Sequence, residues 1–358
     1  MNVGRTETRF LDAATAPLDE ARQAALAVAT KSRHLTRIIA RRDLRIPFLA
    51  TLQIVILGAV TAVRPLWLFV LGPIVLGIPH LASDVRYLVL RQRVAREVIF
   101  VGIAAVALFL GFQGLELAHR PIPHWASLEV ATATAWILAA ILSGAREREG
   151  DKTFFLLPLL FVLAGGVWAC SHAGLFRILL AHAHNVVGVI AWLVVFRKHR
   201  KAALLPVAAL TLVAGLLLSG FTLGVTSQWK AFGIDLAAAS HTLAPGLPAR
   251  WALGAVLSFV FLQSIHYAAW LVWIPQDNLP GEGTFTFRMT ARSLLADFGG
   301  PALAIIAALC VALAGAAAFD AKSAVRTYMS LATFHGYFEI ALLAYFAARG
   351  RGRATPAS

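Results

Sequence analysis

Charged residues are scarce in this chain. Only 14% of its 358 residues are Asp, Glu, Lys or Arg, whereas 59% are hydrophobic, and the mean hydropathy is +0.74. This composition excludes an ordinary soluble domain, in which about a quarter of the residues are charged. The long apolar runs also lack the alternation of a membrane β-strand. Because only helices and closed barrels satisfy the backbone in lipid, the sequence predicts an all-α, polytopic membrane helical bundle.

Cysteine and acidic residues are also few. The two cysteines, Cys170 and Cys310, fall in apolar segments, where we expect buried free thiols rather than a disulfide. The 18 acidic residues are outnumbered by 32 Lys and Arg, which gives a formal net charge of +14. Most of the basic residues lie in alternate loops between the apolar runs. Since the positive-inside rule explains this pattern, we expect no nucleic-acid partner.

The apolar runs have about the 20 residues that a helix needs to cross a bilayer. We predict about ten transmembrane helices, at residues 46–63, 66–90, 98–115, 126–143, 153–170, 174–196, 203–225, 251–275, 300–318 and 325–348. The basic loops place both termini in the cytoplasm, in a cell membrane of the bacterial inner-membrane type. The prediction divides the chain into a basic amphipathic cytoplasmic segment (1–45), a transmembrane domain (46–348) and a short basic cytoplasmic tail (349–358).

Five histidines fall inside the predicted transmembrane helices. They are His80, His182, His184, His266 and His335. The four helices that carry them run in the same direction, and each histidine lies near the membrane midplane. Ionisable residues at that depth are costly and usually functional, so we predict that these histidines hold a metal. His182 and His184 are about 200° apart on a helix, so only one faces the site, and the sequence does not choose between them.

Two of these histidines are followed one helical turn later by a carboxylate. Asp84 follows His80, and Glu339 follows His335. Residues four apart share one helix face, and a carboxylate there can orient an imidazole or carry a proton. We therefore predict catalytic roles for Asp84 and Glu339. Pro79 removes an amide donor, which should loosen the helix immediately before His80.

Aromatic residues surround two of the candidate ligands. They are Tyr267 and Trp270 after His266, and Phe334, Tyr337 and Phe338 around His335. An apolar pocket lined in this way would suit a flat, lipid-like substrate that enters from the membrane lipids.

The donor set limits the choice of metal. Zinc enzymes usually use three protein ligands and an open position, whereas four imidazoles without a thiolate suit iron or copper. We expect Fe(II), and another divalent metal or a haem between paired histidines remains compatible with the sequence.

Two short motifs resemble those of one known family. They are Gly77-Ile78-Pro79-His80 with Asp84, and His266-Tyr267 ahead of Trp270 and Trp273. Both are similar to motifs of the Brp/Blh family of membrane β-carotene 15,15′-dioxygenases. The resemblance implies an all-helical membrane enzyme that holds iron through four histidines and cleaves β-carotene into two retinals with dioxygen. It supports His80 and His266 as ligands most directly.

The leading functional hypothesis is an integral-membrane, histidine-ligated metalloenzyme. It would be an iron-dependent oxygenase that cleaves or oxidises an apolar polyene or isoprenoid such as a carotenoid. The alternative is a proton- or ion-coupled transporter or channel that uses the same intramembrane histidines and carboxylates. A haem-binding electron-transfer subunit is a third interpretation.

Overall fold

The computed structural model describes residues 5–92, 94–120, 122–148, 155–197, 200–278 and 286–350. Almost all of these residues are helical, and the sheet that they contain is a two-residue ladder of β1 (Lys230–Ala231) with β2 (Ile234–Asp235). The predicted all-α fold is therefore confirmed. Residues 1–4 of the predicted N-terminal segment and 351–358 of the predicted tail lie outside the described residues.

The chain forms two compact units, each assembled from segments that are far apart in the sequence. Unit 1 comprises Met1–Arg86 and Gly188–Lys322, and unit 2 comprises Tyr87–Val187 and Ser323–Ser358.

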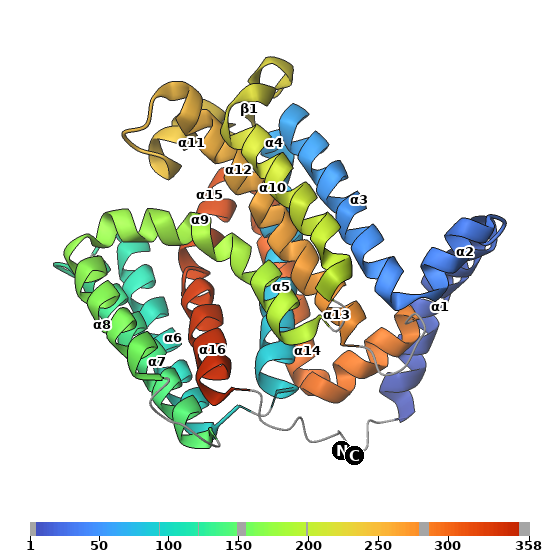
Figure 1. The fold of residues 1–358 in the computed structure, drawn as a ribbon, viewed down its shortest axis with the longest axis horizontal. Helices are drawn as coiled ribbons and strands as arrows, with labels where there is room; N and C mark the ends of the chain where they lie inside the picture. The colour runs from blue at the N-terminus through green and yellow to red at the C-terminus, as the bar shows by residue number, and fades with distance from the viewer. Residues whose placement is uncertain are drawn as a thin grey trace. The chain divides into compact units, whose positions relative to one another are not determined.

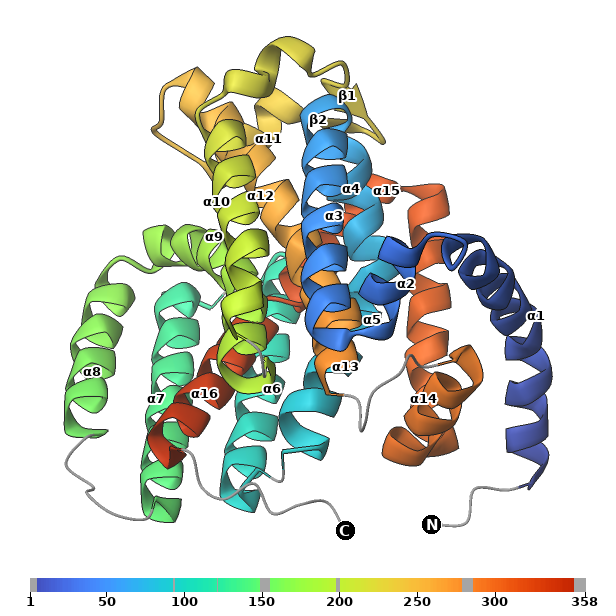
Figure 2. The ribbon, with the colours of Figure 1, turned by 45° about the vertical axis from the view of Figure 1, so that its right-hand side comes forward.

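Unit 1 is built around α12, which is buried along most of its length. In this unit α3, α10 and α12 pack side by side (Figure 2). Its α-helices are α1 (Arg5–Ala29), α2 (Arg33–Ala40), α3 (Arg42–Val63), α4 (Pro65–Leu71), α5 (Gly77–Asp84), α10 (Leu204–Leu218), α11 (Leu236–Leu243), α12 (Ala249–Ala268), α13 (Ile274–Asp277) and α14 (Phe287–Phe319). Its 3-10 helices are η5 (Arg200–Ala203) and η6 (Phe221–Val225).

Unit 2 is organised around α7, which packs against α6, α8 and α16 (Figure 1). Its helices are α6 (Arg96–Leu117), α7 (Trp125–Glu147), α8 (Leu156–Ser171), most of α9 (Ala173–Ala191), nearly all of α15 (Ala321–Leu331), and α16 (Phe334–Arg349). The approach of α7 to α16 depends on Gly144, because a Cβ at that position would overlap the backbone of Tyr345. The Tyr345 hydroxyl donates a 2.8 Å hydrogen bond to Glu147, which fixes the same contact.

Among the described residues, nine helices are long and apolar enough to cross a membrane, which makes this a membrane protein. They match nine of the ten predicted spans. The fifth predicted span, 153–170, corresponds to α8, which has 16 residues. At 1.5 Å per residue α8 is about 24 Å long, shorter than the roughly 30 Å hydrocarbon core of a bilayer.

Four π-helical segments interrupt three of the spans. They are η1 (Gly72–Leu76), η2 (Val85–Leu90), η4 (Trp192–Phe196) and η7 (Ala269–Trp273). η1 ends directly before α5, where Pro79 cannot donate a backbone hydrogen bond, so the loosened stretch predicted before His80 is a π-helical one. Such π-bulges occur frequently at functional sites, and here all three interrupted spans carry candidate ligands.

The amphipathic helix α1 packs against α14 within unit 1. Asp19 accepts hydrogen bonds from the backbone amides of Phe287 (2.6 Å) and Arg288 (3.3 Å), and so caps the start of α14. Arg292 also donates to Asp12, and this hydrogen bond holds the pKa of the Asp12 carboxyl below its ordinary value. The N-terminal segment is thus fastened to a neighbouring helix.

Candidate metal centre

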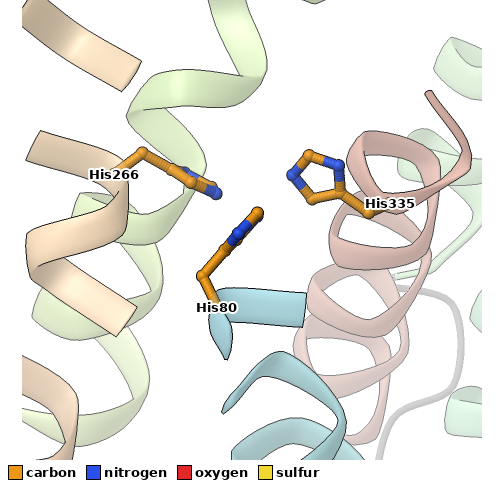
Figure 3. A group of neighbouring side chains, drawn as sticks. All are labelled: His80, His266 and His335. Atoms are coloured by element: carbon orange, nitrogen blue, oxygen red, sulfur yellow. The ribbon is translucent and has the colours of Figure 1, made fainter. Parts of the chain in front are cut away.

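Unit 1 brings together two of the predicted ligands. His80 on α5 and His266 on α12 are both fully buried. Their ring centroids are 5.4 Å apart with the ring planes at 76°, and a ring nitrogen of one lies within 4.8 Å of a ring nitrogen of the other. Figure 3 shows both side chains reaching from their helices towards the same space. Since metal–imidazole bonds are about 2.0–2.1 Å long, the two nitrogens are close to the separation that one shared ion requires.

The tautomer of His80 is set by the backbone. Its Nδ1 lies 3.3 Å from the carbonyl oxygen of Leu76, the last residue of η1. Because a carbonyl can only accept, Nδ1 carries the proton and Nε2 carries the lone pair. Metal-binding histidines typically have this arrangement, in which the second nitrogen is oriented by a backbone or carboxylate acceptor.

Aromatic packing and one hydrogen bond fix the helices that carry this pair. The Tyr267 ring lies 4.6 Å from the His80 ring, and a Cβ at Gly72 would come within 3.1 Å of Tyr267. The Ser83 hydroxyl donates a 2.6 Å hydrogen bond to the backbone carbonyl of Trp270 in η7. Both histidines are therefore carried by α5 and α12 in a fixed register.

Gly188 packs directly against the imidazole ring of His266. A Cβ at this position would lie 3.1 Å from His266 Nδ1 and 3.0 Å from Trp270 Nε1. Both distances are shorter than ordinary van der Waals contact, so a side chain at residue 188 would displace the ring.

We expect Gly188→Ala to weaken metal binding about tenfold, the size of effect typical when the support of a ligand is disturbed. Competition titration with a metal chelator would measure this. Gly174→Ala is the matched control, because it lies in the same helix with no atom within 4 Å of the added Cβ. Equal affinities for the two variants would contradict the expectation.

Unit 2 contains a second pair with the same features. His184 on α9 and His335 on α16 are buried, with ring centroids 5.0 Å apart and planes at 89°. His184 Nδ1 lies 3.2 Å from the Leu180 carbonyl oxygen, and His335 Nδ1 lies 2.8 Å from that of Ala332. These contacts place the lone pair on Nε2 in both rings, as in His80. The pair is closely packed, because a Cβ at Gly336 would lie 3.3 Å from His184 Cβ.

The structure separates the two candidates on α9. His184 is the one whose ring lies against His335, whereas His182, two residues earlier, is half-buried. Because the two side chains leave the helix about 200° apart, the burial of one face selects His184.

Both predicted carboxylates are fully buried. Within unit 2, an oxygen of Glu339 lies within 4.8 Å of a ring nitrogen of His335. Within unit 1, Asp84 is the last residue of α5 and follows His80 by one turn of regular α-helix. Each acid therefore shares a helix face with its histidine, as the spacing predicts.

A polar network in unit 2 was not predicted. Glu129 on α7 is buried and accepts hydrogen bonds from Gln113 (2.7 Å) and from the Tyr337 hydroxyl (3.0 Å), with Arg177 3.4 Å away. The Tyr337 ring stacks on Phe109 at 5.3 Å. Glu129 is the only acidic residue in the apolar run 126–143. An isolated acid inside a predicted span is the sequence feature from which its role could have been inferred. Tyr337, predicted as a pocket residue, anchors α16 to α7.

The other predicted pocket residues differ in burial. Trp270 is fully buried, with its ring 6.5 Å from that of Phe196. Phe338 is half-buried, with its ring 6.1 Å from that of Trp136, and Phe334 is also half-buried.

In each unit, buried histidines and a buried carboxylate offer donor atoms that could bind a metal ion. Their donor atoms fit such an ion, since imidazole nitrogens with backbone-fixed tautomers and buried carboxylates are its usual ligands. Comparison with protein-family models, curated proteins and solved structures finds no match for this chain.

Proposed function

We propose that this chain is an integral-membrane metalloenzyme that binds metal through its two histidine pairs. The pairs are His80 with His266 in unit 1, and His184 with His335 in unit 2. The observation that carries the proposal is the repetition of one arrangement: two buried, near-perpendicular imidazoles on different helices. In three of the four rings a backbone carbonyl fixes the tautomer. A single buried histidine is often a packing residue, but two matched pairs are better explained by metal binding.

The donor set of four imidazoles suits iron among the transition metals. Four imidazoles without a thiolate are typical of iron or copper sites rather than of structural zinc. We propose Fe(II), which when bound would supply the redox chemistry that reactions of dioxygen need.

The proposed reaction is the oxidative cleavage of an apolar polyene such as a carotenoid. The resemblance of the motifs around His80 and His266 to the Brp/Blh family favours it, and so does the apolar surrounding of both pairs. The imidazoles would hold the ion, Asp84 and Glu339 would orient them and hold protons, and residues such as Tyr267 would exclude water. The substrate would enter from the lipid of a bacterial-type inner membrane, with both termini of the enzyme in the cytoplasm.

An activity assay tests this proposal. Purified protein supplied with Fe(II), β-carotene in detergent and air should release retinal, which chromatography detects. Exclusion of oxygen should stop the reaction, and His80→Ala should lower the rate at least about a hundredfold because a ligand is lost. Retinal formation that is unchanged in His80→Ala would contradict the proposal.

A second candidate function is proton- or ion-coupled transport. The complete burial of Asp84 and Glu339 within membrane helices favours it, since intramembrane carboxylates often serve as proton carriers. Protein reconstituted in liposomes would then carry a proton flux that Asp84→Asn abolishes. Such a flux without consumption of β-carotene would replace the enzyme hypothesis.

A further inference from the structure

A cluster of arginines lies in unit 1 where α3 begins, and none of its residues is a candidate metal ligand. Arg197 is fully buried and donates to Asp277 Oδ1 at 2.8 Å and to the backbone carbonyl of Asp43 at 3.1 Å. Arg45 is buried next to it and donates to the carbonyl of Ile39 at 2.6 Å. A second Arg45 hydrogen bond, 3.4 Å long, reaches Gln276, the neighbour of Asp277. Arg42, at the first position of α3, is close enough for its charge to act on the Asp277 carboxylate.

The negative charge in this cluster does not balance the positive charge. Arg197 is paired with the buried carboxylate of Asp277, the charge of Arg42 also acts on it, and Arg45 is hydrogen-bonded to the neighbouring Gln276. The second oxygen of Asp277, Oδ2, already accepts a 2.6 Å hydrogen bond from Trp192 Nε1. The nearby carboxylate of Asp43 is paired with Arg41, which donates hydrogen bonds of 3.2 and 2.6 Å to its two oxygens.

Three guanidinium nitrogens remain buried without an acceptor among the described residues. They are Nε and Nη2 of Arg42 and Nε of Arg197. A buried, charged donor that lacks an acceptor is costly, and the cost is larger where the surrounding charge is already positive. An anion placed here would accept from these donors and neutralise the excess charge.

We propose that Arg42, Arg45 and Arg197 form a binding site for a phosphate group, either in the headgroup of an anionic phospholipid or in a soluble phosphate compound. Guanidinium groups match the oxygens of phosphate with paired, charge-assisted hydrogen bonds. The position also suits this ligand. The cluster stands where a membrane-spanning helix starts and the amphipathic helix α2 ends, the level at which lipid phosphates lie. The site is independent of the proposed metal.

The test uses the full-length protein in a non-ionic detergent, with affinity measured from the shift of the thermal unfolding midpoint during titration. The probes are dioctanoylphosphatidylglycerol, dioctanoylglycerol, which lacks the phosphate, and inorganic phosphate. We expect saturable stabilisation by the phospholipid and none by dioctanoylglycerol. A comparable response to inorganic phosphate would support the site and identify a soluble ligand as its source.

Arg42→Gln should weaken binding of the phosphate compound about tenfold, because two charged donors are lost. Arg41→Gln is the matched control, since Arg41 is exposed and paired with Asp43. The affinity of this variant for the phosphate compound should stay within about twofold of wild type. Arg42→Lys keeps the positive charge but lacks the paired donors, so this variant should bind the phosphate compound several-fold more weakly than wild type. It provides a second measurement if Arg42→Gln does not fold. Equal affinity in wild type and both Arg42 variants, or no response to either phosphate probe, would overturn the proposal.

Discussion

Replacing His80 or His266 by alanine is expected to remove the bound metal. Wild-type protein should contain about one ion per chain, and either variant less than about a tenth of that, because each substitution removes one of the few protein ligands. Inductively coupled plasma mass spectrometry of the purified proteins measures the content directly and identifies the element.

His172→Ala is the matched control for this experiment. His172 also has its Nδ1 near a carbonyl oxygen four residues earlier, that of Trp168 at 3.0 Å, but its side chain is exposed. His172 and His80 therefore have the same backbone contact at Nδ1, but only His80 is buried and lies against a second histidine. Stable wild-type protein without metal, or full metal content in His80→Ala, would refute the proposed centre.

His184→Ala and His182→Ala are expected to differ strongly from each other. His184 pairs with His335, so its loss should reduce the metal content as much as the loss of His80 does. His182 lies on another face of α9 and should be replaceable with little change. Metal analysis of the two variants, with His335→Ala beside them, measures the difference.

This comparison also tests whether the histidine pair of unit 2 binds metal at all. If His184→Ala and His335→Ala keep their metal while His80→Ala loses it, the ion belongs to unit 1 alone and the proposal that both pairs bind metal is wrong. Thermal unfolding of each variant controls for loss of the fold.

The helical fold and the candidate ligands could be predicted because both follow from hydrophobicity. An apolar run near 20 residues long specifies a span, and a histidine inside one stands out by its cost. The same argument applies to Asp84 and Glu339, whose spacing within regular α-helix puts each on the face of its histidine. The predicted set of histidines contains both pairs that the structure brings together.

The choice between His182 and His184 depends on which face of α9 is buried, and this is decided by neighbouring helices. The role of Tyr337 was missed for a similar reason, since its partner Glu129 is more than 200 residues away in the sequence. The π-helical segments were not predicted either, apart from the loosening at Pro79, because their residues have ordinary helical composition. The structure gives α8 as Leu156–Ser171, whereas the predicted span starts at residue 153, and residues 153 and 154 lie outside the described part of the chain.

The π-helical segments also affect which insertions and deletions this sequence can tolerate. A π-bulge holds one residue more than the α-helical turn that it replaces, so deletion of one residue within Gly72–Leu76 could restore an α-helix without disturbing a loop. The preceding part of the span would then turn about 100° relative to His80. Insertions and deletions are usually tolerated in loops, whereas here a one-residue indel inside a membrane helix would be absorbed by the backbone and would still change which side chains accompany the ligand.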